Sequence, residues 1–178
     1  MTLKYLGGYP ATVHLQVQEL IAHDQLGALL RTRYDQPHGM RTDGALYAYV
    51  QDLKNTYLRS AEPLGKVVFD NKLQVVKHAL GTHTTISRVQ GSKLKTKREI
   101  RIASLFRDAP LPFLRMIAVH ELAHMKERDH GKAFYKLCTY MEPDYHRLEL
   151  DVRLYLTHRD AAGAPLWPLA STAPLGTG

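Results

Sequence analysis

The sequence feature that most constrains this chain is the pentapeptide H-E-x-x-H at residues 120–124. Residues four apart on a helix lie on the same face, so His120 and His124 can direct two imidazole nitrogens at one metal ion. Glu121 lies about 100° around the helix from His120, beside the metal, where a carboxylate can take a proton from water. The pattern therefore predicts two metal ligands and one catalytic base.

Apolar residues at helical spacing surround this motif and predict a buried helix. They are Leu114, Ile117, Ala118, Leu122 and Met125. Pro110 and Pro112 are typical of a helix start, and the charged run at 126–129 is typical of a helix end. We therefore expect the motif on a helix that packs in the core.

His130 is the candidate for a third ligand, because a chain leaving the helix can turn back within six residues of His124. Three histidines would hold Zn²⁺ and leave one position for water. A glutamate from a following helix, Glu142 or Glu149, is the alternative third ligand. We favour His130, since imidazole is the commoner partner at a catalytic site with three ligands.

The metzincin pattern H-E-x-x-H-x-x-G-x-x-H places its third histidine at the same offset as His130. That pattern requires glycine for a sharp turn where this chain has Glu127. We therefore expect the backbone to turn differently here, and we do not assign the chain to the metzincins.

Length and composition indicate a globular protein with a sizeable core, because the 178 residues are 44% hydrophobic and 23% charged. No run approaches the roughly 18 apolar residues of a membrane helix, and the first residues lack the apolar core of a signal peptide. The cytoplasm is therefore the expected compartment, without a membrane partner. The single cysteine, Cys138, is interpreted as a small buried hydrophobe.

The chain is divided into three parts by its periodicity. Residues 1–62 predict a helical region packed on the catalytic part, including a helix that opens at Thr42. Residues 63–157 form the predicted catalytic domain. Residues 158–178, rich in Ala, Gly and Pro with Trp167 as the large anchor, are expected to be a flexible tail.

Within the catalytic domain, β-branched residues predict a sheet of three or four strands. The strands are expected at 67–69, 73–76, 82–89 and 93–103. After the motif helix, a further helix is expected to begin at Gly131, and Asp144 can cap a last helix. Strands followed by helices indicate an α+β fold.

The run at 120–135, with Pro143-Asp144-Tyr145 after it, resembles the YgjP-like metal-dependent hydrolases, a zincin-type metallopeptidase family. The resemblance covers about residues 63–157. It implies a small mixed or antiparallel sheet packed on the active-site helix, zinc held by His120, His124 and His130, and Glu121 as the acid and base. Many members have Trp-Gly-Ser-Cys before the strand ahead of the zinc helix, where this chain has residues 84–92. Because the sequences differ there, the resemblance does not imply that residues 84–92 contact the substrate.

Two classes of function follow. The first, which we favour, is a zinc metallopeptidase in which Glu121 activates water. Within this class, the resemblance also allows a pyrophosphatase that acts on UTP. The net charge of +7 suits such a small anionic substrate. The second class is a DNA-associated protein resembling the SprT-like proteases. Its phosphate contacts would come from Lys93, Lys95, Lys97, Arg98 and Arg101. A nucleic acid partner is thus the weaker hypothesis.

Overall fold

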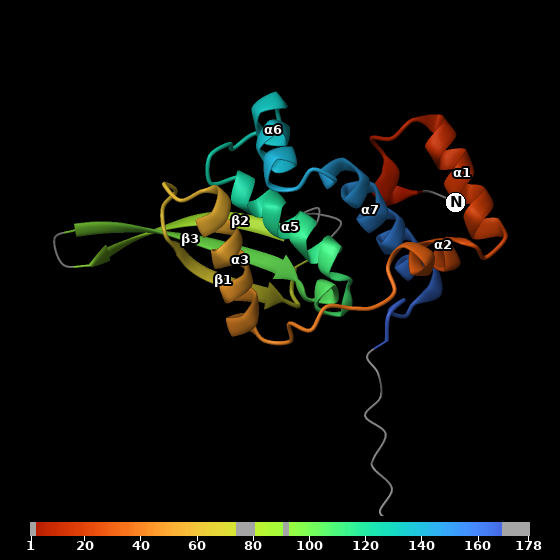
Figure 1. The fold of residues 1–178 in the computed structure, drawn as a ribbon, viewed down its shortest axis with the longest axis horizontal. Helices are drawn as coiled ribbons and strands as arrows, with labels where there is room; N and C mark the ends of the chain where they lie inside the picture. Colours follow the sequence, from red (N-terminus) through yellow and green to blue (C-terminus); the bar gives the residue numbers. More distant parts are fainter. Residues whose placement is uncertain (1–2, 74–80, 91–92, 169–178) are drawn as a thin grey trace, which may run out of the picture.

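The computed structural model describes the backbone of residues 3–73, 81–90 and 93–168, and the side chains of residues 3–73 and 98–168. It has the α+β architecture that the sequence predicts (Figure 1). The α-helices are α1 (Ala11–Ala22), α2 (Leu26–Arg33), α3 (Asp43–Tyr57), α5 (Leu111–Ala123), α6 (Lys132–Met141) and α7 (Tyr145–Ala162). The strands are β1 (Leu64–Asp70), β2 (Gly81–Gln90) and β3 (Lys93–Ala103), and the short 3-10 helices are η1 (Lys4–Leu6) and η2 (Ser104–Asp108).

The described strands form a mixed sheet in the order β1-β3-β2. The central strand β3 pairs parallel with β1, where Val67 lies opposite Ile100, and antiparallel with β2, where Ile86 lies opposite Lys97. The strands expected at 67–69, 82–89 and 93–103 are thereby confirmed. The strand expected at 73–76 falls largely outside the described residues.

Helices α3 and α5 cover one face of this sheet (Figure 1). Thr42 caps α3 as predicted, since its hydroxyl accepts a hydrogen bond from the Ala45 amide at 3.1 Å. Asp43 then accepts a hydrogen bond from the Phe69 amide at 2.9 Å, which fixes the start of α3 against β1. The site helix α5 packs on β2 and β3 and lies between α3 and α7.

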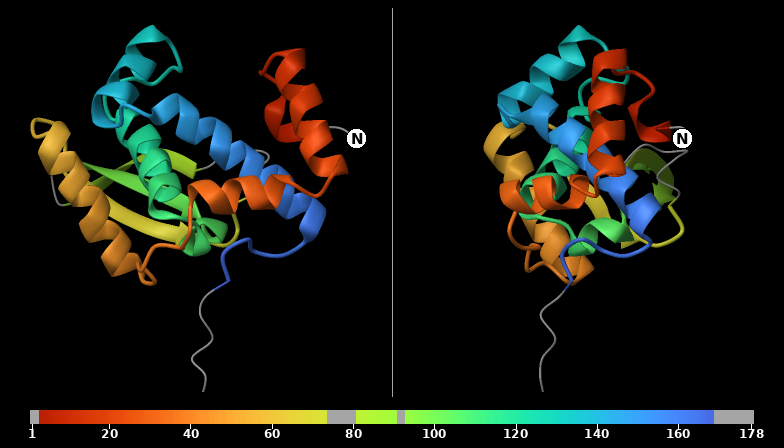
Figure 2. Two further views of the ribbon diagram at one scale, coloured as in Figure 1. Left: turned by 45° about the vertical axis from the view of Figure 1, so that its right-hand side comes forward. Right: turned by 90° about the vertical axis from the view of Figure 1, so that its right-hand side faces the viewer.

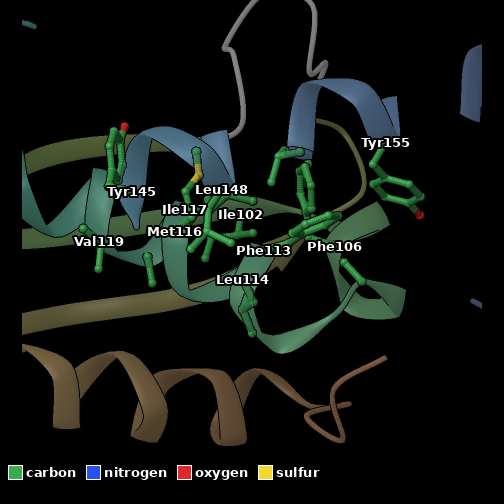
Figure 3. Close-up of a cluster of buried hydrophobic side chains, with 14 of the residues drawn as sticks. Ile102, Phe106, Phe113, Leu114, Met116, Ile117, Val119, Tyr145, Leu148 and Tyr155 are labelled. Carbon is green, nitrogen blue, oxygen red and sulfur yellow. The ribbon is translucent and has the colours of Figure 1, made fainter. Parts of the chain in front are cut away.

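The core is centred on α5, whose side chains are buried on nearly every face. Figure 3 shows Phe113, Met116 and Ile117 of this helix among side chains of β3 and α7. Pro110 and Pro112 stand at the helix start as predicted. A helix enclosed in this way holds its polar residues in fixed positions, which is what a catalytic site requires.

The N-terminal helices join the same buried cluster as α5 and α7. Figures 1 and 2 show α1 and α2 alongside α7, at the end of the molecule away from α3. The Asp151 carboxylate of α7 is fully buried and accepts hydrogen bonds from the Tyr34 hydroxyl and the Arg33 guanidinium, each at 2.6 Å. Because a buried charge requires such partners, Asp151 ties α7 to the end of α2.

The C-terminal part differs from the flexible tail that we expected from residue 158. Helix α7 continues to Ala162 and ends on Gly163 in the left-handed conformation. Leu166 and Trp167 are buried, and the Trp167 indole N–H donates to the Tyr34 carbonyl at 2.7 Å. The expectation is therefore corrected for residues 158–168, since α7 extends through residues 158–162 and the buried side chains of Leu166 and Trp167 dock the segment that follows. Residues 169–178 lie outside the described part.

Asp144 occupies the N-cap position of α7 as expected, but its carboxylate pairs with Arg147 at 3.1 Å and makes no capping hydrogen bond. Cys138 is buried in α6, as interpreted from the sequence. Among the described helices, none combines the length and apolar character that crossing a bilayer needs.

Candidate metal centre

The two histidines of the motif lie at the C-terminal end of α5. His120 lies in the last turn and His124 is the C-cap residue, so the helix ends where its second histidine stands. The Nδ1 atom of His124 contacts the Glu127 carbonyl at 2.9 Å, and Nδ1 of His120 contacts the Tyr145 hydroxyl at 2.7 Å. Both rings are thus held through Nδ1, so Nε2 is the nitrogen of each ring that can face a metal ion.

The turn after α5 brings His130 to these two rings. Its Nε2 atom lies 3.2 Å from Nε2 of His120 and 3.1 Å from Nε2 of His124. Glu127 has no left-handed backbone, because Asp24 is the only non-glycine residue with positive φ in the described part of the chain. The turn therefore differs from the glycine turn of the metzincin pattern, as we expected.

The convergence of three imidazole nitrogens fits a metal ion. A carbonyl oxygen only accepts hydrogen bonds, so Nδ1 of a neutral His124 carries the proton and its Nε2 presents a lone pair. Nitrogens about 2.0–2.1 Å from a tetrahedral ion are separated by roughly 3.4 Å, close to the spacing observed here. Within the described residues, His120, His124 and His130 are the group of potential ligands whose atoms all lie within 4.8 Å of one another.

Phe134 forms an apolar support for the three histidines. Its buried ring lies 4.9 Å from the ring of His120, 4.6 Å from that of His124 and 4.9 Å from that of His130, measured between centroids. The sequence places Phe134 only as an apolar residue of α6. Phe134 lies on α6, four residues after the candidate ligand His130. This spacing is the signal that could have indicated its contact with the histidines.

Glu121 directly follows His120 in the sequence, and its side chain is buried, with 2% of the residue's surface exposed. Burial raises the pKa of its carboxyl group to about 8. Burial also lowers the pKa of His120, to about 3, with smaller contributions from the neighbouring His124 and His130. In the absence of a cation, this environment thus favours uncharged histidine and a protonated glutamate, which is the pattern typical of a functional site.

The alternative third ligands are engaged elsewhere. Glu142 pairs with Arg115, at 2.6 Å between Oε2 and Nε, and Glu149 pairs with Arg153 at 3.2 Å. Neither belongs to the described group of converging ligand atoms. The geometry therefore favours His130 over either glutamate as the third ligand.

The basic residues considered for DNA contacts give that hypothesis little support. Arg98 pairs with Glu62 at 2.9 Å, and Arg101 pairs with Asp70 at 3.1 Å. Arginines already paired with carboxylates are less available to phosphates. The side chains of Lys93, Lys95 and Lys97, like those of residues 84–92, lie outside the described part.

A sequence model of the YgjP-like metallopeptidase domain matches residues 48–153. The chain belongs to the YgjP-like family. The match begins within α3 and ends within α7, so it includes the sheet, α5 and the three histidines. Family membership and the histidine group together indicate a metal-binding hydrolase.

The YgjP-like chain is also 59% identical over 155 residues to the UTP pyrophosphatase of Escherichia coli strain K12. The aligned region covers 87% of this chain and 93% of that relative. No solved structure matches the chain. The relative is named for a nucleotide substrate, so the similarity favours the pyrophosphatase alternative of the sequence analysis over the peptidase that we preferred there.

Proposed function

We propose that this protein is a zinc-dependent pyrophosphatase that hydrolyses UTP to UMP and pyrophosphate. The observation that carries the proposal is the 59% identity to a UTP pyrophosphatase over 93% of that protein's length. The net charge of +7 supports an anionic substrate, because a positive surface raises the local concentration of nucleoside triphosphates.

In this proposal, His120, His124 and His130 hold the metal ion through Nε2. Three neutral imidazoles with one open position make a ligand set typical of catalytic zinc. A bound ion supplies a Lewis acid that polarises phosphate oxygens and lowers the pKa of water. The protein contributes the fixed orientation of the rings, through the Nδ1 contacts of His120 and His124 and the support of Phe134.

Glu121 is the proposed general base and later the general acid. As a carboxylate it takes a proton from the attacking water, and it can return that proton to the departing pyrophosphate. A pKa that burial raises toward neutrality suits both steps, because a proton acceptor works best when its pKa is near the operating pH.

The experiment measures bound metal, thermal midpoint and UTP hydrolysis on the same preparations, with chromatographic detection of UMP and pyrophosphate. Glu121→Gln keeps the shape of the side chain but cannot accept the proton, so we expect full metal content and turnover lower by ~10²-fold or more. Glu19→Gln is the matched control, since Glu19 is exposed on α1. Metal-replete Glu121→Gln protein with wild-type turnover would exclude Glu121 as the base.

A peptidase remains the second candidate, because the matching family model describes a metallopeptidase domain. The same preparations are therefore also incubated with a denatured protein substrate. Cleavage that depends on Glu121, together with absence of UTP hydrolysis, would replace the proposed substrate with a peptide.

A further inference from the structure

We propose that Tyr145 is a positioning residue of the metal centre, whose hydroxyl oxygen accepts a hydrogen bond from Nδ1 of His120 and directs Nε2 of that ring toward His130. This inference rests on the metal centre proposed above. The Tyr145 hydroxyl lies 2.7 Å from His120 Nδ1, and the two rings are nearly parallel, at an interplanar angle of 19°.

The Tyr145 ring is itself held firmly. It is fully buried, and Figure 3 includes it in the hydrophobic cluster with Leu148 and Val119. It is the first residue of α7, and its amide donates to the Glu142 carbonyl at 3.0 Å. The position of its hydroxyl is therefore set by the packing of α7 and not by a mobile side chain.

The direction of the hydrogen bond follows from the role of His120. A neutral imidazole that binds a metal through Nε2 carries its proton on Nδ1, so the Tyr145 oxygen must be the acceptor. The Tyr145 proton is then directed away from His120, and the buried thiol of Cys138 on α6 is the neighbouring group with which the Tyr145 hydroxyl interacts.

His124 is oriented differently, since its Nδ1 contacts the Glu127 carbonyl in the turn that follows α5. His124 is thus oriented by the turn after α5, and His120 by the first residue of α7. The latter contact makes the geometry of the centre depend on how α7 and α6 pack against α5.

The test compares Tyr145→Phe with Tyr155→Phe in the full chain. Tyr155 is the matched control, because it is also a fully buried tyrosine of α7, and its hydroxyl accepts a hydrogen bond from Arg159 at 3.3 Å instead of contacting a histidine. Zinc affinity is measured by competition with a chelator, and the thermal midpoint is measured on the metal-free proteins. Tyr145→Phe is expected to weaken zinc binding by about 10- to 100-fold, whereas Tyr155→Phe changes it by less than about threefold.

Equal zinc affinities of the two phenylalanine variants would overturn the inference. His120→Ala separates this outcome from failure of the metal centre: wild-type zinc affinity in His120→Ala would refute the centre itself. If Tyr145→Phe does not fold, zinc affinity is compared between Cys138→Ser and Cys138→Val. The serine hydroxyl can accept a hydrogen bond from the Tyr145 hydroxyl, and valine cannot. Equal zinc affinity in that pair would also overturn the inference.

Discussion

At the scale of residues, the three histidines are not equivalent. His120 and His124 are placed by one helix and are each held through Nδ1, whereas His130 is exposed and reaches the centre on a turn. Ligands that are already oriented lose less conformational entropy on binding, so they contribute more to affinity.

We therefore predict that His120→Ala abolishes stoichiometric zinc, while His130→Ala weakens zinc binding but leaves a measurable fraction. Metal analysis after dialysis against a defined concentration of free zinc checks both variants. His23→Ala serves as the control, since His23 is exposed at the end of α1. Full zinc occupancy in His120→Ala would contradict the assignment.

Phe134 provides a second prediction at this scale. Phe134→Leu keeps an apolar side chain but removes the ring that contacts all three imidazoles. Each aromatic contact contributes about 0.5–1.5 kcal/mol, so we expect zinc affinity to fall roughly tenfold. Leu137→Ala on the same helix is the control, and an effect of equal size there would indicate general loosening of α6.

At the scale of elements, the connection between α2 and α3 is fixed by a buried histidine to η2, the short helix that precedes α5. His38 Nε2 donates to the Phe106 carbonyl at 2.8 Å, and its Nδ1 accepts from the Met40 amide at 3.1 Å. Burial lowers the pKa of His38, and protonation of Nδ1 would break the contact with Met40. The connection thus requires a neutral ring.

This arrangement predicts a dependence of stability on pH. Below the unfolded-state pKa of 6.5 the unfolded chain binds more protons at this position than the folded chain, so stability falls as pH falls. His38→Gln retains a donor and an acceptor but does not titrate. We expect the thermal midpoint of the wild type to drop more between pH 7 and pH 5 than that of His38→Gln. Parallel pH profiles would exclude this role of His38.

At the scale of the whole molecule, the described segment after α7, residues 163–168, packs against the hydrophobic core through Leu166 and Trp167. Trp167 packs on Phe113 and Tyr155, with ring centroids 5.7 and 5.1 Å away, and donates to the Tyr34 carbonyl. It thereby connects the segment after α7 to α2 and to the beginning of the site helix α5.

We predict that Trp167→Ala destabilises the protein by about 3–5 kcal/mol, the range for truncating a large buried aromatic residue. Trp167→Phe keeps most of the packing and loses the hydrogen bond, so a smaller loss is expected. Denaturant unfolding of the metal-free protein measures both. Wild-type stability in Trp167→Ala would show that the segment does not contribute to the core.

Much of the candidate site could be predicted from local sequence, because helical spacing alone puts His120 and His124 on one face. The offset of His130 indicated a third ligand but left Glu142 and Glu149 open. Pairing of those glutamates with Arg115 and Arg153 depends on contacts between separate helices, which no local pattern encodes.

The motif helix, the order of the described helices and strands, and the chemistry of the ligands could be predicted from the sequence, since these depend on spacing and on the residue types present. Which residues support the centre, and that Leu166 and Trp167 are buried, follow only from the tertiary structure. In the sequence, Phe134 and Tyr145 were part of the family resemblance without a role at the site, and Trp167 was the large residue of an expected tail. Their roles arise from packing of α6, α7 and the C-terminal segment around α5, and the free energy of such packing depends on surfaces that meet only after folding.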